Sequence, residues 1–234
     1  MNDKPKRPLA EARAQAERLI EMLRPGCERI EIAGSVRREK PEVGDVEIVC
    51  APRVTRISQE QIFGPEFAEV DSLWAIVDGL VYGSFHRKLR YADYIDRNGK
   101  FTQKKDGPKY RGVCFPEDPG FKFEIFTVPS MDDWGVNFTI RTGSAEFSRQ
   151  FVTRARYCGV RVMFARLWRL KYLGPANATI DEMNRAWETA STEPEMRAIA
   201  DNIVCPEERD FFRECGIRWV PPQARNGAED VRPI

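Results

Sequence analysis

The chain has 234 residues, 42% of them hydrophobic, and 37 basic residues almost balance 36 acidic ones. This length allows one large globular domain or two small ones. No run of about 18 apolar residues and no signal-like apolar stretch occurs, so we expect no membrane span, no export and a cytoplasmic location. The six cysteines lack C-x-x-C spacing and His86 is the single histidine, which argues against zinc. A catalytic metal ion would therefore have mainly oxygen ligands, as magnesium or manganese prefer.

The first elements in chain order alternate between helix and strand. Apolar residues at helical spacing predict an amphipathic helix over 9–23, and alternation predicts a half-buried strand over 29–32. After a glycine-serine turn and a short basic segment, residues 45–48 alternate again. This second strand directs Asp45 and Glu47 to one face, since side chains of a strand alternate with a period of two.

The middle of the chain combines a helix, a polar segment and a further strand. A helix is expected over about 66–79. The polar segment 82–111, rich in basic residues, is expected to be irregular or hairpin-like. Residues 121–126 alternate, with Glu124 on the polar side of the strand.

The second half of the chain is expected to be mostly helical. Helical periodicity runs to about residue 173 and returns near 179–200 and 206–215. The expected fold class is therefore α+β, a mixed sheet with flanking helices followed by a mostly helical part. We place the two domains at 1–130 and 131–234.

Charge is distributed unevenly in this half. Residues 141–171 contain eight basic residues and one acid, with aromatic residues between them, whereas residues 181–214 contain ten acids and four arginines. A basic segment with aromatics suits a phosphate-rich partner such as DNA. A solvated helix face with its aromatics in the core explains the same pattern equally well.

Three acids and one turn are the candidates for chemistry. An acid pair on one strand with a third acid on another suits two hard cations that assist displacement at phosphorus. Alternating acids alone more often form a solvated face. The Gly34-Ser35 turn can bind a phosphate through its backbone N–H groups, its hydroxyl and nearby arginines. An ordinary strand-to-helix turn is the alternative, and only the combined spacing favours the functional interpretation.

Three segments in order resemble the family X DNA polymerases. GSVRR at 34–38, followed after six residues by Asp45-Val46-Glu47, looks like the family signature G-S-x-R-R…G-D-x-D. Residues 142–147 are similar to the T-G-S segment, and residues 207–225 resemble the C-terminal E-x-x-x-F…G-x-x-Y-I-P-P-E-x-R. The resemblance implies a nucleotidyltransferase palm followed by a thumb, as in minimal members without the N-terminal lyase domain.

The resemblance also implies roles for single residues. Asp45, Glu47 and Glu124 would be the catalytic carboxylates and would bind Mg2+ or Mn2+, although the family usually has Asp where this chain has Glu47 and Glu124. The residues implied to contact the nucleotide phosphates are Gly34, Ser35, Arg38 and Gly44. Those implied to lie beside its sugar and base are Thr142, Gly143 and Ser144. The basic side chains expected to follow the DNA backbone are Arg149, Arg154 and Arg156.

The function expected from the resemblance is nucleotidyl transfer from a nucleoside triphosphate to a DNA 3′-hydroxyl. We expect a small, monomeric, gap-filling repair-type DNA polymerase whose partners are gapped or primer-template DNA and nucleoside triphosphates. A template-independent enzyme, or one acting on RNA or small molecules, is the main alternative. A catalytically weak DNA-binding protein with the same fold is the other.

Overall fold

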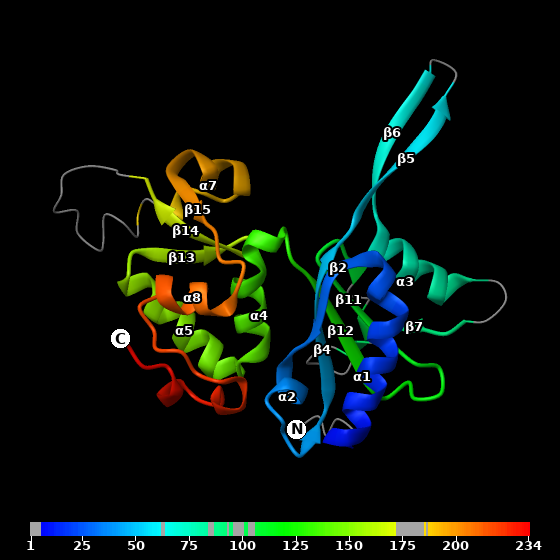
Figure 1. Ribbon diagram of the computed structural model, residues 1–234, viewed down its shortest axis with the longest axis horizontal. Coiled ribbons are helices and arrows are strands. Elements are labelled where there is room, and N and C mark those ends of the chain that lie inside the picture. Colours follow the sequence, from blue (N-terminus) through cyan, green and yellow to red (C-terminus); the bar gives the residue numbers. More distant parts are fainter. Residues whose placement is uncertain are drawn as a thin grey trace. The chain divides into compact units, whose positions relative to one another are not determined.

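The computed structural model describes residues 6–61, 64–83, 87–92, 94–95, 101–102, 106–171, 185 and 187–234 (Figure 1). The chain divides into two compact units, Met1–Val128 and Pro129–Ile234. Each unit has its own hydrophobic core and is described by itself.

A mixed sheet forms the centre of the first unit. Its strands, in spatial order, are β10 (Asp106–Gly107), β11 (Tyr110–Cys114), β12 (Lys122–Thr127), β4 (Asp45–Pro52) and β2 (Cys27–Ile32), with β7 (Arg90–Tyr91) also paired to β11. β12 and β4 run parallel, and the other pairs in this sheet are antiparallel. The parallel pair joins segments far apart in the sequence, so it depends on tertiary packing rather than on a tight turn.

Two helices cover one face of this sheet (Figure 1). They are α1 (Leu9–Leu23) and α3 (Ser72–Tyr82), and the helix expected over 9–23 is confirmed. The buried side of α1 presents Ala12, Ala16, Leu19, Ile20 and Leu23. The strands contribute Val46, Ile48, Phe123 and Ile125, all 0% exposed. Because strand side chains alternate, the neighbouring polar residues of β4 and β12 lie on the opposite face.

A long hairpin precedes α3 and projects beyond the end of the sheet (Figure 1). It pairs β5 (Val54–Gln61) with β6 (Gly64–Asp71) in antiparallel register. The helix expected over 66–79 is thus wrong in its first part. Asp71 explains the boundary, because its Oδ1 accepts hydrogen bonds from the N–H groups of Leu73 at 3.0 Å and Trp74 at 3.2 Å, as an N-cap does.

Short pairs complete the first unit. They are β1 (Arg7–Pro8) with β3 (Glu42–Val43), and β8 (Tyr94–Ile95) with β9 (Phe101–Thr102). The latter pair supports the hairpin-like interpretation of 82–111, parts of which lie outside the described residues. A single turn, α2 (Gly34–Arg37), links β2 to the segment before β4.

Helices predominate in the second unit, around a small sheet. The helices bounded within its described residues are α4 (Trp134–Thr142), α5 (Ala145–Tyr157), α7 (Glu193–Ile199) and α8 (Glu208–Glu214). The sheet has the antiparallel order β13 (Val160–Met163), β14 (Arg166–Leu170) and β15 (Ala200–Ile203). The 3-10 turns are η2 (Met131–Asp133), η3 (Pro222–Ala224) and η4 (Ala228–Asp230). Phe147, Phe151, Phe211 and Phe212 pack together in the core. The α+β fold class is confirmed.

The expectation of helix as far as residue 173 is wrong. α5 ends at Tyr157 and the chain forms the β13–β14 hairpin, in which Met163 pairs with Arg166. The two turn residues have positive φ, 54° for Phe164 and 65° for Ala165. Such turns match the twist of a hairpin but usually contain Gly, Asn or Asp, so the sequence carries no signal for this one. The helical stretch expected near 179–200 is described only in part, and α8 confirms the one near 206–215.

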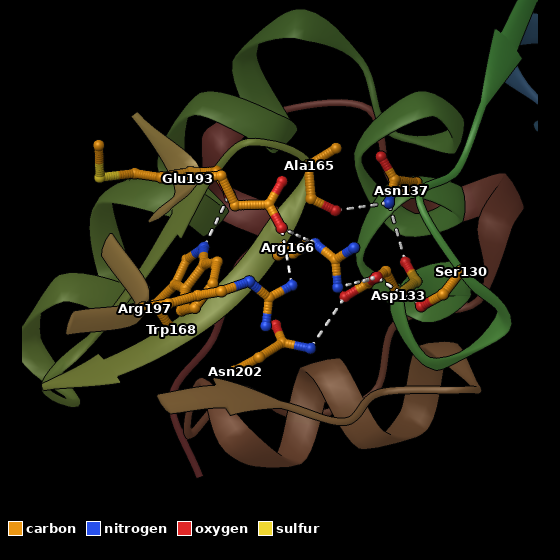
Figure 2. A network of polar contacts seen from close by, with 10 residues as sticks. Ser130, Asp133, Asn137, Ala165, Arg166, Trp168, Glu193, Arg197 and Asn202 are labelled. Carbon is orange, nitrogen blue, oxygen red and sulfur yellow. Dashed lines mark hydrogen bonds and ion pairs between the residues drawn. The ribbon is translucent and has the colours of Figure 1, made fainter. Parts of the chain in front are cut away.

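A buried acid, Asp133, organises the start of the second unit (Figure 2). Its Oδ2 accepts a hydrogen bond from the Ser130 hydroxyl at 2.7 Å and lies 3.0 Å from a guanidinium nitrogen of Arg166. Its Oδ1 accepts a bond from the Asn202 amide at 3.4 Å. These partners compensate for the burial of a charge that is 0% exposed.

The same network extends to α7 and to the hairpin turn (Figure 2). Glu193 lies 3.2 Å from Nε of Arg166 and 2.7 Å from a terminal nitrogen of Arg197. The Asn137 amide donates to the backbone oxygens of Asp133, at 2.9 Å, and of Ala165, at 2.8 Å. The network therefore fixes the start of α4 to β14 and α7.

No helix in the described part of the chain is long and apolar enough to cross a membrane.

Candidate active site

The candidate carboxylates lie on one face of the β4–β12 strand pair. Glu47 on β4 is in register with Glu124 on β12, and Asp45 is in register with Lys122. Adjacent strands are about 4.8 Å apart and register partners project to the same face. The side chains are half-buried, whereas the intervening Val46 is fully buried. The structure thus places Glu124 beside Glu47, with Asp45 two residues along the same strand.

The turn after β2 lies directly against Glu47. Gly34 has a φ of +61°, and a Cβ built on it would lie only 2.3 Å from Oε2 of Glu47. The N–H of Ala33 donates to the backbone oxygen of Glu47 at 2.8 Å. Two features favour glycine at position 34: the left-handed backbone conformation, and the Glu47 carboxylate that occupies the space of a side chain.

Ser35, Arg38 and Gly44 surround this turn. Ser35 is half-buried in the first turn of α2, whose leading N–H groups have no partner four residues back in a helix. Burial lowers the pKa of the Arg38 guanidinium, and the negative charge of Glu47 opposes that shift, so the two groups interact. Gly44 is half-buried in the bend immediately before β4. The turn therefore combines donors and a positive charge next to the acids.

Tyr110 is a further residue of this face that the sequence did not indicate. Its hydroxyl donates a hydrogen bond to Oε1 of Glu124 at 2.9 Å. Tyr110 lies on β11, in the segment expected to be irregular or hairpin-like, and reaches Glu124 only because β11 pairs with β12. A tyrosine 14 positions from an acid has no helical or strand periodicity with it, so spacing could not have revealed the contact.

The donor set of this face suits a hard divalent cation. Its three carboxylates offer only oxygen ligands, which magnesium and manganese prefer. Among the described residues, however, no group of three or more His, Cys, Asp or Glu side chains is gathered as a metal site. Glu47 reaches toward Gly34 on the β2 side, and Glu124 reaches toward Tyr110 on the β11 side. The ligand chemistry fits the cation, and the carboxylates are drawn to opposite sides.

Thr142, Gly143 and Ser144 form the corner between α4 and α5 in the second unit. The Ser144 hydroxyl accepts the N–H of Phe147 at 3.1 Å as the N-cap of α5, and it donates to the backbone oxygen of Asn226 at 2.7 Å. A Cβ on Gly143 would lie 2.5 Å from the Phe147 ring. Thr142 is fully buried. These contacts give the corner a structural role and leave its predicted nucleotide role a prediction.

The three candidate arginines of α5 do not share one face. Arg149 and Arg156 are exposed and seven residues apart, which places them on the same side of the helix. Arg154 is half-buried, with its guanidinium carbon 5.8 Å from the centroid of the Tyr157 ring. Phe147 and Phe151 occupy the buried side. The exposed face of α5 is therefore basic through two of the three arginines.

Comparison with known proteins gives matches among solved structures. No protein-family model matches the chain, and no curated protein matches it. The ternary P/T complex of Leishmania infantum polymerase beta matches with a TM-score of 0.61 and 18% identity, over 94% of this chain and 77% of that one. The ternary gap complex of the same polymerase matches with a TM-score of 0.64 and 17% identity, over 94% and 71%. The chain therefore has the fold of polymerase beta, as its resemblance to the family X DNA polymerases implied.

Proposed function

We propose that this protein transfers a nucleotide from a nucleoside triphosphate to a DNA 3′-hydroxyl, as a small gap-filling, repair-type DNA polymerase that depends on a divalent metal ion. The observation that carries the proposal is the register of Glu47 with Glu124, with Asp45 on the same face and the Gly34 turn against Glu47. The likeness of the fold to that of polymerase beta supports the proposal.

The three carboxylates are proposed as metal ligands and as the catalytic residues. Bound there, Mg2+ or Mn2+ would supply the positive charge that favours ionisation of the 3′-hydroxyl and offsets the charge of the triphosphate. Asp45 and Glu47 share a strand that is buried on its other face, so their backbone positions are rigid. Glu124 comes from the neighbouring strand and is proposed to bind the cation beside the 3′-hydroxyl.

The Gly34 turn is proposed to bind the outer phosphates of the nucleotide. Backbone N–H groups of the turn and the Ser35 hydroxyl can donate to phosphate oxygens, and Arg38 can add a charged pair of donors. Gly34 and Gly44 let the chain pass close to the ligand. Arg38 is half-buried, and partial burial strengthens its attraction for a phosphate.

The second unit is proposed to contribute the remaining contacts. Thr142, Gly143 and Ser144 would lie beside the sugar and base of the nucleotide. The exposed face of α5, with Arg149 and Arg156, would neutralise phosphates of the DNA backbone, and Arg154 on its flank would add to this charge. Such contacts carry no sequence preference, as repair synthesis requires.

Primer extension tests the proposal. The full chain is incubated with DNA that has a one-nucleotide gap, with each nucleotide in turn and with Mg2+ or Mn2+. We expect incorporation of the nucleotide complementary to the template, and loss of incorporation in Asp45→Ala with DNA binding retained on a gel. Glu17→Ala is the matched control, since Glu17 is an exposed acid on α1, and it should behave as wild type.

Two results would contradict the proposal. Incorporation that ignores the template would show a template-independent nucleotidyltransferase. Binding of gapped DNA without pyrophosphate release, with either metal, would show a DNA-binding protein that keeps the fold.

A further inference from the structure

Tyr110 contacts one of the proposed metal ligands without being one itself. Its hydroxyl donates to Oε1 of Glu124 at 2.9 Å, and its ring packs on Phe126 with centroids 4.9 Å apart. Register explains the reach: Tyr110 pairs with Phe126, and Gly112 pairs with Glu124. Because Gly112 has no side chain, the tyrosine can extend over it to the carboxylate.

The hydrogen bond holds Glu124 on the side away from β4. The sheet order is β11-β12-β4-β2, so Tyr110 and Gly34 flank the two glutamates from opposite sides. Glu47 occupies the space beside Gly34, and Glu124 accepts from Tyr110. Glu47 and Glu124 are register partners on adjacent strands, so their negative charges repel each other. The contacts with Gly34 and Tyr110 keep the two carboxylates apart.

We propose that Tyr110 is a positioning residue for Glu124, an inference that rests on the proposed function. A glutamate has one more rotatable bond than the aspartate usual at this position in the family, so its carboxylate is less well fixed by the strand. The Tyr110 hydroxyl fixes one oxygen, Oε1, and leaves Oε2 to bind the cation. Carboxylates that bind metals are commonly oriented by such hydrogen bonds, and loss of the partner typically costs about 10–100-fold in metal affinity or activity.

The variant Tyr110→Phe removes the hydroxyl and keeps the ring that packs on Phe126. Binding of Mn2+ alone to the protein, followed by electron paramagnetic resonance of the free ion, is the first measurement. Single-turnover incorporation into gapped DNA is the second. We expect Mn2+ affinity and the incorporation rate each to fall about 10-fold, at the low end of the range for such partners, with an unchanged KM for the nucleotide. Tyr82→Phe is the matched control, because Tyr82 is an exposed tyrosine at the end of α3, and it should change neither quantity.

Testing Tyr110→Phe in a second variant, Glu124→Asp, distinguishes a positioning role of the hydroxyl from a general loss of stability. In Glu124→Asp the carboxylate is one methylene shorter and is drawn back from the hydroxyl. Adding Tyr110→Phe to that variant should change Mn2+ affinity less than twofold, whereas a structural role for Tyr110 would lower the affinity in both backgrounds.

Failure of the proposed role of Tyr110 and failure of the proposed function give different results. Wild-type incorporation together with unchanged Mn2+ binding and rate in Tyr110→Phe would overturn the positioning role alone. Absence of wild-type primer extension together with weaker Mn2+ binding in Tyr110→Phe would overturn only the proposed polymerase. A wild-type protein that binds no Mn2+ would overturn both.

Discussion

Asp133 in the second unit and the carboxylates of the β4–β12 face show two different uses of acidic side chains. Asp133 is 0% exposed, and both of its oxygens accept from donors on other segments of the chain (Figure 2). Glu47 and Glu124 are half-buried and are register partners on adjacent strands, where like charges repel. The first arrangement balances its charge within the chain, whereas the second places two like charges side by side.

The difference teaches how a structural acid can be told from a candidate ligand. A buried acid surrounded by Ser, Asn and Arg donors has its charge balanced already, so removal leaves those donors unsatisfied. Acids at paired positions on adjacent strands carry an electrostatic cost, which a bound cation would reduce.

The largest expected effect is on stability. Asp133→Ala should lower the free energy of unfolding by about 3–5 kcal/mol, because it removes one of the two carboxylates paired with Arg166 and the buried acceptor of Ser130 and Asn202. Asp45→Ala should change it by less than about 1 kcal/mol. Urea unfolding followed by tryptophan fluorescence measures both, since four of the five tryptophans lie in the second unit. Equal losses in the two variants would remove the distinction.

The next effect is on activity. Gly34→Ala forces a side chain into a left-handed conformation and brings its Cβ to 2.3 Å from Oε2 of Glu47. We expect incorporation to fall about 100-fold, the order of loss for a displaced catalytic group, and stability to fall by about 1–2 kcal/mol.

Gly79→Ala is the control for that substitution. Gly79 lies inside α3, where an added Cβ meets nothing within 4 Å. Activity should be retained and stability should rise by about 0.5–1 kcal/mol, the preference of a helix interior for alanine. Full activity in Gly34→Ala would show that the turn does not shape the site.

The third effect is on DNA binding, and it distinguishes exposed arginines from an arginine that is paired with acids. Arg166 is held by Asp133 and Glu193, whereas Arg149 and Arg156 are exposed on α5. The double variant Arg149→Ala/Arg156→Ala should bind gapped DNA about 10-fold more weakly at low salt. The slope of log K against log salt should fall by about 2, roughly one for each lost phosphate contact. Fluorescence anisotropy at several salt concentrations measures both quantities.

An exposed arginine of the first unit is the control for this double variant. Arg24→Ala removes a side chain that pairs with Glu21 at the surface. It should leave the slope unchanged. An unchanged slope in the double variant as well would place DNA elsewhere on the molecule.

The smallest effect concerns Ser144, which has a structural role and a proposed binding role. Ser144→Ala should lower the free energy of unfolding by about 1 kcal/mol, because the N-cap of α5 is lost. Chemical denaturation measures this loss, and steady-state kinetics measure the KM for the nucleotide. A stability unchanged from wild type would contradict the capping role. A tenfold rise in the KM for the nucleotide, under conditions in which the variant is still folded, would place Ser144 in the nucleotide site.

Parts of the fold could be predicted from local patterns, and the reasons are visible in particular residues. Apolar spacing predicted α1, and alternation placed Asp45 and Glu47 on one face of β4. The prediction failed at 160–170, where two residues with positive φ make a hairpin turn without glycine. It also failed at the start of α3, where Asp71 caps a helix that begins later than the expected residue 66.

The sequence by itself determined which residue types were available for chemistry: three acids on predicted strands, a glycine-serine turn before two arginines, and the motif order that resembles family X. Only the tertiary structure decided their neighbours. Glu124 lies beside Glu47 because β12 pairs in parallel with β4, and Tyr110 reaches Glu124 because β11 pairs with β12. Side-chain direction repeats every two residues and is encoded locally. Strand register between segments far apart in the chain arises from burial of the whole core, which no local pattern contains.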